Sequence, residues 1–116
     1  MNQLQPTQLS PQKLEKWLRS SSTPFIIDVR EEEELAVANF SSPVLHLPLS
    51  QSERWISSLA DHLPRDRSIV VLCHAGIRSW NFALWLLNQG LVDQIWNLDG
   101  GIDGWSINID PSIPRY

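Results

Sequence analysis

The sequence has 116 residues, a length that favours one compact domain. Hydrophobic residues make up 42% of it and charged residues 19%, a balance that argues against a disordered chain. The net charge of -4 and the scattered positions of the basic residues argue against nucleic acid as a partner. We therefore expect a single globular domain that binds small molecules or proteins.

The same sequence shows no segment that would direct it to a membrane or out of the cell. No apolar run approaches the roughly 20 residues of a membrane-spanning helix, and residues 1–11 lack the basic start and apolar stretch of a signal peptide. One cysteine cannot form an internal disulfide, which fits a reducing compartment. These features predict a cytoplasmic protein, with a monomer as the expected state.

The first half of the chain alternates helix and strand patterns. Ser10 and Pro11 predict a helix start, because a hydroxyl side chain favours the N-cap and proline the first helical position. Residues 25–29 are almost wholly apolar, which is typical of a strand covered on both faces. A short second helix is expected from residue 31 towards residue 39, where four acidic side chains suit the positive end of a helix dipole.

The second half continues the alternation. Residues 44–47 predict a strand, and Ser50 and Glu53 have the spacing of a capping box that would begin a helix. Residues 68–72 are β-branched, apolar and bounded by polar residues, as in a buried strand. A helix is expected from about Ser79 to Gly90, followed by a strand over residues 95–98 and a Gly100–Gly101 turn.

The order of these elements predicts an α/β fold. Strands that read as continuous apolar runs and alternate with helices are typical of a mostly parallel sheet covered by helices on both faces. In such sheets ligands bind at the carboxyl ends of the strands, where Cys73 follows the strand at 68–72. We expect one domain over residues 1–116, with its core at about 9–106 and an irregular tail at 107–116.

The loop that begins at Cys73 has the character of an anion-binding nest. It passes through Gly76 into a helix, so backbone N–H groups of the loop and of the first helical turn can point inward. Such groups favour an anion at their centre, and the sulfur of Cys73 would lie there as a thiolate. A thiolate among donors can attack a sulfane sulfur, and the donors can then hold the persulfide anion. An inert cysteine that ends a buried strand is the alternative, which the loop context disfavours.

Several neighbouring side chains are candidates for supporting roles. Arg78 has two open interpretations, since its planar fork suits either an anionic donor or the loop carbonyls. Ser79 is expected to be the N-cap of the following helix. His74 is not expected to act as an acid or base, because adjacent residues usually point apart. No spacing links His46 and His62 into a metal site.

Four separated motifs together resemble the rhodanese family, in the family's order and over nearly the whole chain. They are Ile27-Asp28-Val29-Arg30 followed by acidic residues, Pro48, Cys73-x-x-Gly76-x-Arg78-Ser79, and Gly100-Gly101-x-x-x-Trp105. The resemblance implies a three-layer α/β/α sandwich and a thiosulfate or persulfide sulfurtransferase that forms a Cys73 persulfide without metal or organic cofactor. It also implies that Asp28 and Arg30 are structural residues near the site. The residues expected to bind the sulfur are His74, Ala75, Gly76, Ile77, Arg78 and Ser79.

The sequence departs from the family pattern at one segment and matches a subgroup at another. Residues 38–43 lack the glycines that the family often has there, which leaves the turn geometry open. The tail at 110–116 resembles that of rhodanese domains fused to ubiquitin-activating-like enzymes. The expected partners are a small sulfur donor and a thiol or protein acceptor, with neither nucleic acid nor a membrane involved.

Two other functions are compatible with such a chain. Phosphatases and arsenate reductases of the same fold carry five residues between cysteine and arginine, whereas four lie between Cys73 and Arg78. A non-catalytic redox-sensing or partner-docking module is also possible, but inactive members of the fold typically lack the cysteine. The sequence therefore favours a sulfurtransferase over both alternatives.

Overall fold

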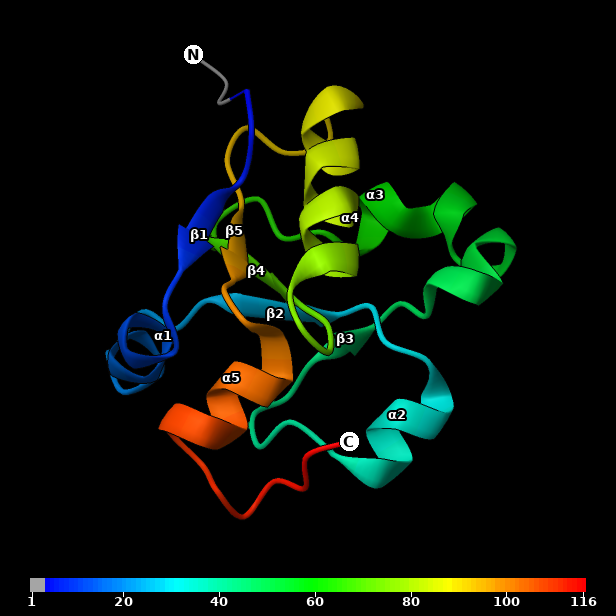
Figure 1. The fold of residues 1–116 in the computed structure, drawn as a ribbon. Coiled ribbons are helices and arrows are strands. Elements are labelled where there is room, and N and C mark those ends of the chain that lie inside the picture. The colour runs from blue at the N-terminus through cyan, green and yellow to red at the C-terminus, as the bar shows by residue number, and fades with distance from the viewer. Residues whose placement is uncertain (1–3) are drawn as a thin grey trace.

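The structure is a computed structural model that describes residues 4–116, and it contains a five-stranded parallel sheet with helices on both faces (Figure 1). The strand order is β1-β5-β4-β2-β3, and every neighbouring pair is parallel. The strands are β1 (Thr7–Leu9), β2 (Phe25–Asp28), β3 (Leu45–His46), β4 (Ile69–Leu72) and β5 (Trp96–Leu98). The predicted α/β/α architecture is therefore confirmed.

Within residues 4–116, four α-helices and two 3-10 segments lie between the strands, and a fifth α-helix follows the last strand. The helices are α1 (Pro11–Leu18), α2 (Glu32–Val37), α3 (Leu59–His62), α4 (Ile77–Asn88) and α5 (Gly101–Asn108). The 3-10 segments are η1 (Leu49–Arg54) and η2 (Ile56–Ser58). Among residues 4–116, no helix is long and apolar enough to cross a membrane.

The central strand β4 divides the hydrophobic core into two parts. Successive side chains of a strand point to opposite faces. Ile69 and Val71 accordingly pack against α3 and α4, whereas Val70 and Leu72 pack against α1 and α5. All four are buried, which explains why the strand reads as one apolar run. The strand that leads into Cys73 is thus fixed from both sides.

Two predicted helix starts are wrong. Helix α4 begins at Ile77 with Gly76 as its N-cap, so Ser79 lies inside the first turn and not at the cap. Gly76 has a φ of 100°, a conformation that favours glycine. The predicted capping box of Ser50 and Glu53 is also absent, since both residues belong to η1 and the Ser50 hydroxyl contacts the Glu31 carboxylate instead.

Two elements of the structure were not predicted from the sequence. Strand β1 has three residues and pairs with β5 near the other end of the chain. Helix α5 follows the predicted Gly100–Gly101 turn, and both glycines have positive φ. The residues after Asn108 form neither helix nor strand, but Ile113 among them is buried.

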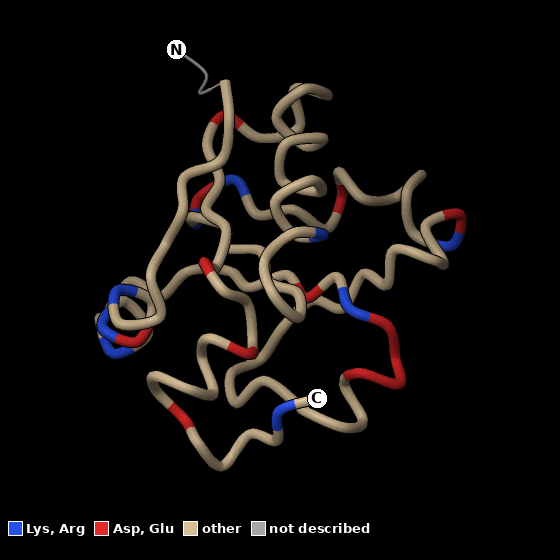
Figure 2. Tube along the Cα trace, viewed as in Figure 1, with Lys and Arg blue, Asp and Glu red and all other residues tan. Residues whose placement is uncertain are grey.

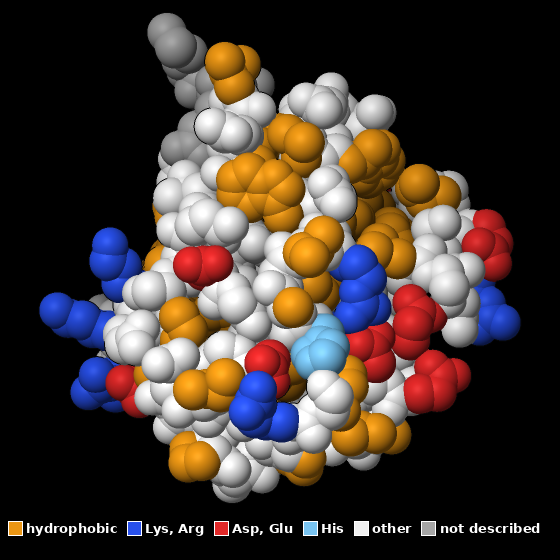
Figure 3. Space-filling view, in the orientation of Figure 1, with side chains coloured by type: hydrophobic (Ala, Val, Ile, Leu, Met, Phe, Trp, Pro, Cys, Tyr) orange, Lys and Arg blue, Asp and Glu red, His pale blue; other side chains and the backbone are white. Residues whose placement is uncertain are grey.

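The charged residues are spread over the surface in separate groups. Figure 2 shows basic residues gathered at α1 and acidic residues at the start of α2. On the face shown in Figure 3, basic side chains lie in several places, and hydrophobic side chains are exposed over α4. This face therefore offers no continuous basic surface for a polyanion.

Candidate active site

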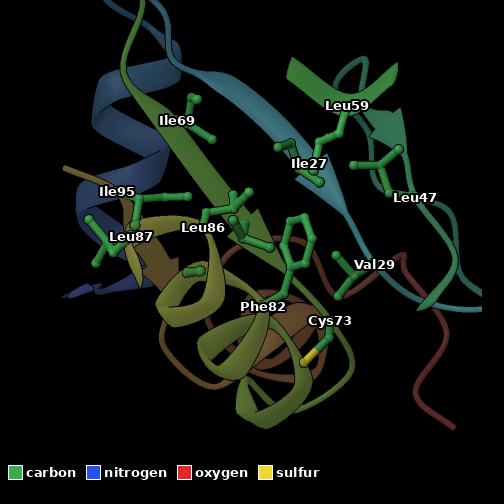
Figure 4. Packing of buried hydrophobic residues seen from close by; sticks show 12 residues of the cluster. Ile27, Val29, Leu47, Leu59, Ile69, Cys73, Phe82, Leu86, Leu87 and Ile95 are labelled. Carbon is green, nitrogen blue, oxygen red and sulfur yellow. The ribbon is translucent and has the colours of Figure 1, made fainter. Parts of the chain in front are cut away.

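Cys73 lies directly after β4, in the loop that leads to α4. Its side chain is 1% exposed and belongs to the core cluster on the α4 side of the sheet, beside Val29 and Phe82 (Figure 4). The Sγ atom accepts hydrogen bonds from the backbone N–H of Gly76 at 3.1 Å and of Ser79 at 3.4 Å. The Ser79 Oγ lies 3.2 Å from the same sulfur. Two backbone N–H groups thus converge on the sulfur, as an anion-binding nest requires, and the Ser79 hydroxyl lies within hydrogen-bond distance of it.

The first turn of helix α5 donates backbone hydrogen bonds to this loop. The backbone N–H of Ile102 donates to the Cys73 carbonyl at 2.9 Å, and that of Asp103 donates to the His74 carbonyl at 3.0 Å. Gly101 has a φ of 61°, and a Cβ there would overlap the carbonyl groups of Cys73 and His74. The Gly100–Gly101 pair therefore lets the first turn of α5 approach the loop backbone, where its free N–H groups find acceptors.

A buried polar network adjoins the sulfur through Ser79. Ser79 and Asn97 are both 0% exposed. The Ser79 hydroxyl donates to Asn97 Oδ1 at 2.5 Å, and Asn97 Nδ2 donates to the Gly76 carbonyl and to Gln8 Oε1, each at 3.0 Å. Sequence reasoning missed Asn97 and Gln8; the available signal was a polar residue within the apolar strand at 95–98.

Arg78 is held by a carboxylate of α2. Its two terminal nitrogens each donate to an oxygen of Glu34 at 2.8 Å, a bidentate arrangement. The hydrogen bond from Arg78 is the main reason that the pKa of Glu34 falls to about 2, and the same contact raises the pKa of Arg78. The Arg78 fork thus pairs with a side chain of α2, a partner that neither of its two interpretations from the sequence included.

The pH dependence of stability tests this ion pair. Because the folded-state pKa of Glu34 is lowered, its contribution is present above about pH 4.5 and is lost as the pH falls towards about 2. Glu34→Gln is expected to lower the free energy of unfolding by about 1–2 kcal/mol at neutral pH, after allowance for solvent screening. Urea titrations measure the free energy of unfolding of both proteins, and the difference between Glu34→Gln and wild type should become smaller as the pH is lowered. Glu15→Gln, which breaks an exposed pair with Arg19, is the control. If the free energies of unfolding of Glu34→Gln and wild type differed by the same amount at every pH, the ion pair would not be the cause.

A second ion pair lies at the end of β2. Arg30 and Asp28 are both 0% exposed and form hydrogen bonds of 2.8–3.2 Å between their side chains. Burial alone would lower the pKa of Arg30, but the hydrogen bonds to Asp28 and Tyr116 outweigh it and raise the pKa. The Arg30 carbonyl also contacts His46 Nε2 at 2.6 Å. Asp28 and Arg30 thus lie inside the protein and connect β2 with other elements.

The last residue of the chain lies over the loop. The ring of Tyr116 stacks on that of His74, with centroids 4.1 Å apart and an interplanar angle of 15°. Its hydroxyl donates to Glu34 Oε1 and accepts from Arg30 Nη1, each at 3.0 Å. Burial is the main cause that raises the pKa of Tyr116. The tail therefore closes one side of the site, a contact between residues too far apart for sequence spacing to predict.

The other loop residues face outward. Ala75 is exposed, and the Ile77 side chain is 72% exposed. A groove of about 370 Å³ continues from Arg78 along α4; its lining residues are Leu49, Ser52, Trp55, Ile56, Arg78, Asn81, Phe82 and Trp85. Within residues 4–116, no cluster of three or more His, Cys, Asp or Glu side chains is placed to hold a metal ion.

Comparison with known proteins places this fold and loop in one family. The rhodanese-like domain family matches residues 10–108, so the chain belongs to the rhodanese-like family. The resemblance inferred from the four motifs is thereby confirmed.

The relatives carry several names. The chain is 37% identical over 91 residues to the rhodanese-like/PpiC domain-containing protein 12, chloroplastic, of Arabidopsis thaliana, covering 78% of this chain and 30% of that protein. It is 28% identical to the putative sulfurtransferase YtwF of Bacillus subtilis, covering 90% and 94% of the two chains. It is also 28% identical to the probable adenylyltransferase/sulfurtransferase MoeZ of Mycobacterium tuberculosis, covering 93% of this chain and 26% of MoeZ. The chain thus spans less than a third of the Arabidopsis and mycobacterial relatives.

Solved structures show the same fold. Saccharomyces cerevisiae Ygr203w, described as a homolog of single-domain rhodanese and of the Cdc25 phosphatase catalytic domain, aligns with a TM-score of 0.72. The alignment covers 97% of this chain and 91% of that one at 19% identity. At this identity the likeness shows the fold alone.

Proposed function

We propose that this protein is a sulfurtransferase that carries sulfane sulfur on Cys73. The observation that carries the proposal is the convergence of the Gly76 and Ser79 backbone N–H groups on Cys73 Sγ, at 3.1 and 3.4 Å, with the Ser79 hydroxyl 3.2 Å from the same sulfur. Membership of the rhodanese-like family and the sulfurtransferase names of relatives support it. Donors preorganised around a sulfur stabilise both a thiolate and a persulfide anion.

The proposed reaction has two exchange steps. The Cys73 thiolate attacks the terminal sulfur of a donor; a new S–S bond forms on Cys73 while the donor's bond to that sulfur breaks, which releases sulfite from thiosulfate or a thiolate from a persulfide. An acceptor thiolate, or cyanide in the test tube, then attacks the outer sulfur and restores the Cys73 thiolate. In this scheme the loop from His74 to Ser79 holds the sulfur, and Asp28 and Arg30 support the loop from within.

The surface of the loop indicates the chemical class of the donor and acceptor. A small sulfane-sulfur donor and a thiol or protein acceptor fit a loop whose exposed members, Ala75 and Ile77, are apolar. We propose that the chain acts as a monomeric single domain in the cytoplasm. No second cysteine is present to resolve the persulfide, so the acceptor must come from outside the chain.

Phosphate or arsenate is a poorer ligand for this loop. The four residues between Cys73 and Arg78 make a short loop. In addition, the Arg78 fork is engaged by Glu34, whereas a bound oxyanion would need those donors. Both features favour a single sulfur atom over a tetrahedral oxyanion.

Intact mass spectrometry tests the proposed function. After incubation with thiosulfate or a small persulfide, the reduced protein should gain the mass of one sulfur atom, and cyanide should remove it. The Cys73→Ser variant, which keeps the loop and replaces only the nucleophile, should gain nothing. If the protein gains no sulfur from thiosulfate or from the persulfide, the sulfurtransferase assignment is wrong. Hydrolysis of an aryl phosphate by the same sample would then indicate a phosphatase.

A further inference from the structure

The Ser79 hydroxyl has one proton and two neighbours that can accept it. Asn97 Oδ1 lies 2.5 Å from Ser79 Oγ, and Cys73 Sγ lies 3.2 Å from it. A hydroxyl donates one hydrogen bond at a time. The two acceptors therefore compete, and the shorter contact favours donation to Asn97 Oδ1.

The orientation of the Asn97 amide is fixed by its other contacts. Asn97 Nδ2 lies 3.0 Å from the Gly76 carbonyl oxygen, which can only accept a hydrogen bond. The second hydrogen of the amide nitrogen is directed to Gln8 Oε1, also at 3.0 Å. A flipped amide would place two oxygens against each other at Gly76. Asn97 thus presents only an acceptor to Ser79.

We propose that Asn97 is a positioning residue that sets the direction of the Ser79 hydroxyl proton and thereby the charge state of Cys73. With a neutral thiol, Ser79 donates to Asn97, and its oxygen is free to accept the S–H of Cys73. When the sulfur becomes a thiolate or a persulfide anion, the hydroxyl turns and donates to the sulfur, because a hydrogen bond to a charged acceptor is stronger. Asn97 Oδ1 then loses its partner in a buried site, which opposes the charged state.

This competition for one hydroxyl proton sets Asn97 against the charged form of the sulfur. The donor nevertheless remains within reach when a charged sulfur forms. The inference rests on the nucleophilic role proposed for Cys73, and it explains why a fully buried amide lies behind the nest. It also gives β1 a part in the site, since Gln8 of this strand holds the amide.

Titration of the Cys73 thiolate absorbance in the far ultraviolet tests the proposal, with Cys73→Ser as the baseline. Asn97→Ala releases the Ser79 hydroxyl to the sulfur, so the titration midpoint should fall by about one pH unit. Ser79→Ala removes the donor and should raise the midpoint. In the double variant, the Asn97 substitution should have no further effect, because it acts only through Ser79.

Further variants distinguish an Asn97 that directs the Ser79 hydroxyl from an Asn97 that only holds the loop in place. Asn97→Asp keeps the acceptor and adds negative charge, so its midpoint should rise. Asn97→Leu, similar in volume but without an acceptor, should lower the midpoint and serves if Asn97→Ala does not fold. Asn108→Ala, which removes an exposed amide bonded to the Gly104 carbonyl, should leave the midpoint unchanged. A purely structural Asn97 would loosen the nest and raise the midpoint in Asn97→Ala. An unchanged or raised midpoint in that variant would overturn the proposal.

The charged groups around the sulfur are the same in all these variants except Asn97→Asp. Arg78 of α4 acts electrostatically on Cys73. The other charged or titratable groups, which contact the loop or each other, are His74, Glu34, Tyr116, Asp103, His46, Asp28 and Arg30. A fall in the midpoint of Asn97→Ala therefore reports the hydroxyl. The titration needs no sulfur donor, so a protein that fails to load sulfur but shows the predicted shifts would disprove the sulfurtransferase function and not the role of Asn97.

Discussion

Replacing Gly101 with alanine is expected to abolish most sulfur loading and to lower the free energy of unfolding by about 3 kcal/mol or more. Gly101 has a positive φ, and a Cβ at this position would overlap the carbonyl groups of Cys73 and His74. Those are the two carbonyls that accept hydrogen bonds from the first turn of α5. The loop and α5 must therefore separate, which moves the sulfur away from its donors. Urea titration and mass spectrometry after thiosulfate measure the two effects.

Gly90→Ala is the matched control. Gly90 also has a positive φ of 69°, but no atom lies within 4 Å of the position of its Cβ. The substitution therefore adds backbone strain of about 1–2 kcal/mol without a clash. It lies at the far end of α4 and should leave sulfur loading unchanged. Equal effects of the two alanines on stability and loading would show that Gly101 matters only through its φ.

Replacing Arg30 with methionine is expected to lower the free energy of unfolding by about 3–5 kcal/mol, because Asp28 would remain as a buried charge without its partner. Both side chains are 0% exposed, and three contacts of 2.8–3.2 Å join them. Arg30 also donates to the Tyr116 hydroxyl at 3.0 Å. The variant should therefore release the tail as well, which the fluorescence or the hydrogen exchange of the last residues would report.

Two comparisons show whether the unpaired charge of Asp28 causes the loss of stability in Arg30→Met. Arg19→Met breaks an exposed pair with Glu15 on α1 and should change the free energy of unfolding by no more than about 0.5 kcal/mol. The double variant Asp28→Leu/Arg30→Met removes both charges and should be more stable than Arg30→Met alone, since an apolar pair can replace a buried ion pair. A double variant less stable than the single one would assign the loss to packing.

The buried ion pair and the loop belong to one connected set of contacts. Arg78 reaches Glu34 on α2, Glu34 accepts from Tyr116, and Tyr116 accepts from Arg30 on the end of β2. Loop position thus depends on α2, β2 and the C-terminal tail together. We therefore expect substitutions at Glu34 and Arg30 to act on Cys73 through several contacts. Gly101 lies directly against the carbonyl groups of Cys73 and His74, so its substitution should have the strongest effect on the loop.

Patterns within short stretches of the sequence were sufficient for the fold class and for the place of Cys73 after the central strand. The apolar run before Cys73 predicts the central strand, because a strand buried on both faces has no polar positions. Gly76 marks the turn that follows, because the helix after it begins from a conformation that favours glycine. The rhodanese-like resemblance needed only the order and spacing of four such motifs, and the family match over residues 10–108 confirms it.

The sequence by itself therefore determined the architecture, the family and the position of Cys73, since hydrophobic periodicity and turn chemistry act between residues close in the chain. Only the tertiary structure decided the partners of the site: Glu34 for Arg78, Tyr116 for His74 and Asn97 for Ser79. Strand β1 and helix α5 were missed for the same reason, because each is fixed by contacts with distant segments. Such contacts arise when parallel strands bring remote residues to one edge of the sheet. The spacing of residues within a short stretch of sequence does not predict them.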